Sequence, residues 1–135
     1  MVGEDVRSST MTEIDELFDL QHLNRPMVYL AGPYATPDPV ENTHKTLKFA
    51  DRLIEEGVVT PFVPHLTLLW HLVTPRPATF WYAYDFAALT RCDGLFRIPG
   101  LSTGADAEVE LAKRRGIPTF GDESDLYSWA ADWRS

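Results

Sequence analysis

Residues 94–115 read GLFRIPGLSTGADAEVELAKRR. The apolar start, Gly94–Ile98, predicts a β-strand, and the periodic run Ala105–Arg115 predicts a helix. Ser102 and Glu108 place a hydroxyl and a carboxylate where the strand gives way to the helix. In open parallel α/β sheets this edge binds ligands, and a helix N-terminus attracts anions. The stretch therefore predicts an α/β fold with a ligand site at this turn.

The same alternation of strand and helix continues on both sides of this stretch. Further strands are predicted at 27–31, 58–63 and 117–120, and further helices at 43–56, 79–92 and 124–133, the last capped by Ser124. Residues 34–42 contain prolines and are predicted as a loop, while 65–73 are apolar but ambiguous. Strands that alternate with helices are typical of βαβ units. We therefore expect a single α/β domain over residues 26–135, a Rossmann- or flavodoxin-like parallel sheet of four to five strands with helices on both faces.

Residues 1–25 read as an N-terminal appendage to that domain. Thr12 is a candidate cap for a short helix over 13–20. A mobile tail is the alternative, and the sequence does not decide between them.

Composition and charge exclude several classes of function. A chain of 135 residues favours one domain, and a net charge of −8 argues against binding a nucleic-acid backbone. The single cysteine, Cys92, excludes an intramolecular disulfide and a cysteine-based zinc site. No apolar run approaches the ~18 residues of a membrane span, and the N-terminus lacks the pattern of a signal peptide. We therefore expect a cytoplasmic protein without nucleic-acid or membrane partners.

Two acidic residues are candidates for chemistry at the ligand-binding edge. Asp85 ends the run Trp81-Tyr-Ala-Tyr-Asp85, and Glu108 lies one turn into the following helix. Two carboxylates that flank one pocket suit cleavage of a glycosidic bond. One attacks the anomeric carbon, and the other manages the proton of the leaving group.

Three motifs in this order resemble the nucleoside 2-deoxyribosyltransferase superfamily. They are VYLAGP at 28–33, Asp85 followed by Cys92-Asp93, and Ser102-x-Gly-x-x-x-Glu108. The resemblance covers about residues 27–120 and is nearest to uncharacterised bacterial and phage members with the Trp-Tyr-x-Tyr-Asp stretch. The superfamily includes N-glycosidases of nucleoside 5′-monophosphates.

The resemblance implies a role for each matching residue. Glu108 matches the nucleophile that attacks C1′ and forms a covalent glycosyl ester. Asp85 matches the carboxylate that helps to protonate the departing base, and Tyr29 matches the residue that positions the nucleophile. Ser102 stands where transferases of free nucleosides usually have Asp, whereas nucleotide hydrolases have Ser, which can donate to a 5′-phosphate.

The substrate site implied by the resemblance is larger than these four residues. Its binding residues are Gly32, Pro33, Tyr34, His65, Trp81, Tyr82, Ser102 and Gly104. Asp106 and Glu110 stand where the family often has glycine, which places negative charge near the phosphate and leaves room for a nucleoside or another glycoside. The resemblance implies no metal or organic cofactor, and a homodimer or higher homo-oligomer in which a neighbouring subunit closes the pocket.

The leading hypothesis is hydrolysis of the N-glycosidic bond of (deoxy)nucleoside 5′-monophosphates. Base exchange between deoxynucleosides and a non-catalytic nucleotide-binding module are the alternatives. The residues taken singly also allow simpler interpretations: Glu108 as a solvated carboxylate at the helix start, Asp85 as an exposed residue or a partner of Arg91, Ser102 as a helix cap, Tyr29 as a strand aromatic, and His65 and His71 as structural histidines.

Overall fold

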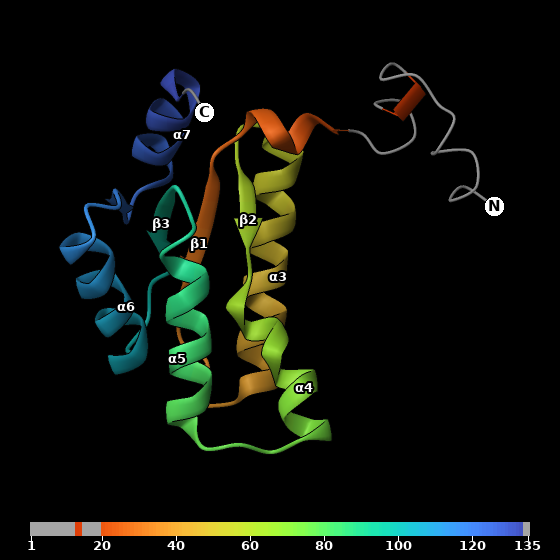
Figure 1. The fold of residues 1–135 in the computed structure, drawn as a ribbon, viewed down its shortest axis with the longest axis vertical. Helices are drawn as coiled ribbons and strands as arrows, with labels where there is room; N and C mark the ends of the chain where they lie inside the picture. The colour runs from red at the N-terminus through yellow and green to blue at the C-terminus, as the bar shows by residue number, and fades with distance from the viewer. Residues whose placement is uncertain (1–12, 15–19, 134–135) are drawn as a thin grey trace.

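The computed structural model of the chain describes residues 13–14 and 20–133 (Figure 1). Its strands form one sheet in the order β2-β1-β3-β4, and every neighbouring pair is parallel. The strands are β1 (Met27–Ala31), β2 (Thr60–Phe62), β3 (Gly94–Arg97) and β4 (Thr119–Phe120). The predicted parallel α/β sheet is confirmed, with four strands in the described part of the chain. Most of the predicted helix over 13–20 lies outside the described residues.

The helices that connect these strands are longer than the strands. They are α3 (Pro39–Glu56), α4 (Thr67–Val73), α5 (Ala78–Leu89), α6 (Thr103–Arg114) and α7 (Glu123–Asp132), with 3-10 turns η1 (Leu20–Asn24) and η2 (Pro64–Leu66). The ambiguous region 65–73 is therefore helical. The predicted helix over 79–92 ends earlier than expected, at Leu89.

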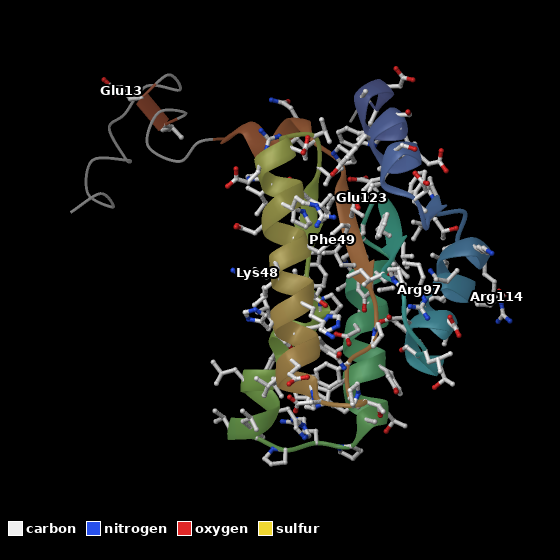
Figure 2. All side chains as sticks on the ribbon, turned by 180° about the vertical axis from the view of Figure 1, so that it is seen from behind. Glu13, Lys48, Phe49, Arg97, Arg114 and Glu123 are labelled. Atoms are coloured by element: carbon white, nitrogen blue, oxygen red, sulfur yellow. The ribbon has the colours of Figure 1, made fainter. Side chains whose placement is uncertain are left out.

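Helices cover both faces of the sheet, as predicted. Successive side chains of a strand point to opposite faces. Val28 and Leu30 accordingly pack in one cluster with α3 and α7, whereas Tyr29 and Ala31 pack in another with α5 and α6. α5 crosses the front of the sheet in Figure 1, and the view from behind in Figure 2 has α3 in front.

The start of α3 and the cap of α7 differ from the prediction. α3 begins at Pro39, inside the stretch predicted as a loop, because proline is compatible with the first helical position and the Asp38 side chain accepts from Glu41 N at 3.1 Å. α7 is capped by Asp122 and not by Ser124, since the Asp122 carboxylate accepts the N–H of Ser124 at 2.7 Å.

The order of the strands positions a crevice beside β1. The chain passes from β1 to β2 on one side and then to β3 on the other. Loops that leave such neighbouring strands in opposite directions open a ligand crevice at the carboxyl ends. The loop after β1 and the loop after β3 nearly touch. Gly100 has φ 127°, and a Cβ on it would lie 2.7 Å from Cγ of Pro33.

Candidate active site

A pocket of about 380 Å³ occupies this crevice. The loops after β1, β2 and β3 form its floor and rim, and α5 and α6 supply its walls. Its lining residues are Gly32, Pro33, Tyr34, Ala35, Thr36, Pro64, His65, Thr67, Ala78, Trp81, Tyr82, Asp85, Leu101, Ser102, Thr103, Gly104, Ala105 and Glu108. All of the predicted substrate-binding residues are among them, together with both carboxylates. Tyr29 does not line the pocket, but its hydroxyl contacts Glu108, which does.

Glu108 is a buried carboxylate and not a solvated one at the helix surface. It is 7% exposed, on the same buried face of α6 as Ala105 and Ala112. The hydroxyl of Tyr29, which is fully buried on β1, donates to Glu108 Oε2. Strand β1 thus fixes one oxygen of the carboxylate.

The surroundings of Glu108 hold its pKa close to neutrality. Burial raises this pKa to about 7, and the charge of Asp85 adds to the increase. The Tyr29 hydrogen bond and the Arg97 charge act in the opposite direction. Tyr29 has its own pKa raised, by burial first and then by Glu108, so its hydroxyl remains a donor.

Asp85 is the second carboxyl group of the pocket. Burial raises its pKa to about 7, and its Oδ1 is buried without a hydrogen-bond partner among the described residues. The pairing with Arg91 does not occur, since the Arg91 guanidinium donates to the Ala87 carbonyl at 2.8 Å. Two coupled carboxyls with a pKa near 7 allow one to be ionised while the other carries a proton. This is the division that nucleophile and acid require.

The first turn of α6 offers donors to an anion. Ser102 is its N-cap, and its Oγ accepts from Ala105 N at 3.0 Å. The Ser102 hydroxyl proton stays available, as do the first N–H groups of the helix at Thr103 and Gly104. Tyr82 lies against this turn, because a Cβ on Gly104 would be 3.4 Å from the Tyr82 hydroxyl oxygen.

Arg97 lies beside the pocket and has a role that the sequence did not predict. Its Nη2 lies 2.9 Å from Asp106 Oδ1 and 2.9 Å from the Gly100 carbonyl. Asp106 is thereby paired, Glu110 lies 3.6 Å from Arg114, and neither acid lines the pocket. The negative charge expected beside the site is thus compensated. A charged residue at the end of a buried strand was the available signal.

His65 presents an acceptor. It is 3% exposed, and its Nε2 lies 2.9 Å from the carbonyl of Pro33. A carbonyl only accepts, so Nε2 carries the proton and Nδ1 is the unprotonated nitrogen. Burial lowers the His65 pKa, which favours this neutral form. Nδ1 is buried and has no partner among the described residues, so the acceptor of His65 is unpaired.

Among the described residues, no lysine and no arginine lines the pocket. Within the described ranges 13–14 and 20–133, no three histidine, cysteine, aspartate or glutamate side chains gather closely enough to hold a metal ion. No helix in the same ranges is both long and apolar enough to cross a membrane.

Among known proteins, matches are found in the comparison of structures alone. No protein-family model matches the chain, and no curated protein matches it. Among solved structures, the chain is similar to a 2-deoxyribosyltransferase from the psychrotolerant bacterium Bacillus psychrosaccharolyticus. The two share 21% sequence identity with a TM-score of 0.49, and the match covers 71% of this chain and 74% of that one.

Proposed function

We propose that this chain is a member of the nucleoside 2-deoxyribosyltransferase superfamily that hydrolyses the N-glycosidic bond of nucleoside 5′-monophosphates. The observation that carries the proposal is one pocket that contains Glu108, held by Tyr29, together with a second buried carboxyl at Asp85. The three sequence motifs, which contain these residues, support the same family.

The reaction proceeds in two displacements. In the first, the Glu108 carboxylate attacks C1′ of the sugar, and the bond from C1′ to the base nitrogen breaks. The base leaves with the bonding pair and takes the proton of Asp85. In the second, the Asp85 carboxylate accepts a proton from water, which attacks C1′. The ester bond to Glu108 then breaks and releases the sugar phosphate.

The 5′-phosphate is held at the start of α6. The Ser102 hydroxyl and the N–H groups of Thr103 and Gly104 donate to it, and the helix dipole favours its charge. An aspartate at position 102 would repel the phosphate, whereas serine donates to it.

Base exchange between deoxynucleosides is the second candidate, and it is favoured because the described residues of the pocket lining include no lysine and no arginine. A phosphate dianion bound there relies on neutral donors, while two carboxylates contribute negative charge nearby. A free nucleoside avoids this repulsion. In that case an incoming base, and not water, resolves the ester on Glu108.

We also propose that the protein forms a homo-oligomer. α4 exposes Leu69 (70%), Leu72 (66%) and Val73 (76%), and Leu101 on the pocket rim is 99% exposed. Apolar side chains gathered on one element are typical of a protein interface. A second copy that covers α4 would also close the pocket.

The test measures release of free base by chromatography. Deoxynucleoside 5′-monophosphates and deoxynucleosides are incubated with the protein, each with and without a free acceptor base. Base release from monophosphates alone supports hydrolysis, and formation of a new nucleoside supports exchange. Tight nucleotide binding without turnover, and with equal affinity in Glu108→Gln, would establish a binding module and contradict both.

A further inference from the structure

Trp81 forms a wall of the pocket, and its one side-chain donor, the indole N–H, already has a hydrogen-bond partner. It is 9% exposed, it lines the pocket, and its indole Nε1 donates to His71 Nδ1 at 2.8 Å. Its ring meets the rings of Trp70 and Phe80 edge to face, with centroids 5.3 Å and 4.9 Å away. The indole is therefore held by packing on two sides and by one directed bond.

The hydrogen-bond partners of His71 determine its tautomer. Its Nδ1 accepts both from Trp81 Nε1 and from the backbone N–H of Arg76, the latter at 3.3 Å. A ring nitrogen that accepts carries no proton, so the remaining proton of neutral His71 lies on Nε2. One atom thus joins α4, the loop before α5, and α5 itself.

We propose that His71 is a positioning residue that holds Trp81 as the base-facing wall of the pocket. Because the indole N–H already donates to His71, the indole that lines the pocket has no further side-chain hydrogen bond to offer a ligand and recognises it through its ring carbons. This wall recognises an aromatic base by stacking, which depends on ring area and tolerates different hydrogen-bonding edges. The inference deepens the proposed function and rests on it.

A purely structural role for His71 predicts a different pattern of binding. Loosening the hairpin of α4 and α5 without any part in base recognition would weaken every ligand of the pocket to the same degree. A positioning role weakens only ligands that carry a base. 2-Deoxyribose 5-phosphate separates the two, because it offers the same sugar and phosphate without a base.

The experiment measures dissociation constants of a purine and a pyrimidine deoxynucleoside monophosphate, their parent deoxynucleosides, and 2-deoxyribose 5-phosphate, for wild type, His71→Ala and His71→Asn. In His71→Ala we expect about 5- to 10-fold weaker binding of the base-bearing ligands, at the lower end of a base-stacking contact, with the larger loss for the purine. Binding of 2-deoxyribose 5-phosphate stays unchanged. His71→Asn restores binding, because the amide oxygen can accept from the indole. His44→Ala, at an exposed position on α3, is the matched control.

Two readouts keep the result interpretable. The ¹⁵N–¹H signal of the Trp81 indole moves in His71→Ala and returns toward its wild-type position in His71→Asn, without any ligand. Equal weakening of all ligands, or unchanged binding of the base-bearing ones, would overturn the inference alone. If no base-bearing ligand binds to the wild type, the proposed function fails, and the inference fails with it. Should His71→Ala not fold, His71→Phe, which keeps a ring but cannot accept from the indole, replaces it: selective loss of the base-bearing ligands supports the inference, and equal loss of all ligands contradicts it.

Discussion

Glu108 is a residue at which reactivity opposes stability. Burial raises its pKa to about 7 in the folded protein, whereas an unfolded glutamate titrates near 4.5. The folded state therefore binds a proton more tightly than the unfolded state. The resulting contribution to stability is fully present below the unfolded pKa and is lost as the pH rises to about 7.

Glu108→Gln removes this penalty while it keeps the shape of the side chain. Relative to wild type, we expect the variant to gain stability as the pH is raised from 4.5 to 7, by on the order of 2 kcal/mol. Denaturant unfolding at pH 5 and pH 8 measures the difference. Glu110→Gln, at an exposed position paired with Arg114, should show no such gain, and an equal gain in both variants would contradict the burial argument.

Tyr29→Phe tests the hydrogen bond to the carboxylate. That bond lowers the pKa of Glu108, so its loss raises the pKa further. Activity requires ionised Glu108 and protonated Asp85, which predicts a bell-shaped pH profile centred near 7. We expect the ascending limb of kcat/KM to move to higher pH in Tyr29→Phe. We also expect the maximum to fall about 10-fold to 100-fold, as for a bond to a charged group.

Tyr84→Phe is the control for this series, since Tyr84 is exposed on α5 and does not line the pocket. An unmoved ascending limb in Tyr29→Phe would show that the hydroxyl does not set the ionisation of Glu108.

At the residue scale, the sequence predicted which side chains would gather but not how their charges balance. Glu108, Asp85 and Tyr29 were placed together because the carboxyl ends of parallel strands meet at one edge. The charge of Arg97 at the end of an apolar run is a signal, but it does not identify the groups that the guanidinium contacts. Its contacts with Gly100 and Asp106 depend on a loop conformation that no local pattern reports.

At the scale of elements, two helix caps provide a matched pair. Ser102 caps α6 inside the pocket, and Asp122 caps α7 outside it. Substitution of either by alanine should lower the free energy of unfolding by about 1 kcal/mol. Only Ser102→Ala should also lower kcat/KM for a nucleoside monophosphate, by about 10-fold, because it removes a donor to the phosphate.

Steady-state kinetics beside denaturant unfolding separates the two effects. Equal losses of activity in Ser102→Ala and Asp122→Ala would indicate that Ser102 acts through stability alone. If kcat/KM of Ser102→Ala fell as much for deoxynucleosides as for monophosphates, Ser102 would not bind the phosphate.

The sequence located most elements because glycine and proline bound the apolar runs. The sequence-based prediction was wrong where a residue is compatible with two kinds of local structure. The prolines around Pro39 predict a loop, although proline also begins helices when a cap such as Asp38 precedes it. Ser124 and Asp122 are both good caps, and the structure selected Asp122. Region 65–73 showed no decisive period, and the packing of Trp70 against Trp81 accompanies its helical form.

For the whole molecule, two properties bear on assembly. The protein has a net charge of −8, and apolar side chains of α4 are exposed. Mutual repulsion between acidic copies has to be offset at an interface that excludes charge. We predict that Leu69→Lys combined with Leu72→Lys converts a dimer into a monomer and reduces turnover, because the pocket loses its cover. Light scattering after size-exclusion chromatography measures the mass, with Leu23→Lys, exposed in η1, as control. A monomeric wild type with full activity would contradict the covered pocket.

A covalent bond between Glu108 and the sugar is detected by intact-mass spectrometry of the protein quenched with acid during turnover of a deoxynucleoside 5′-monophosphate. We expect an added mass of one deoxyribosyl phosphate, located on the peptide that contains Glu108, and no such adduct in Glu108→Gln. Full turnover by Glu108→Gln, or an adduct on another residue, would contradict it.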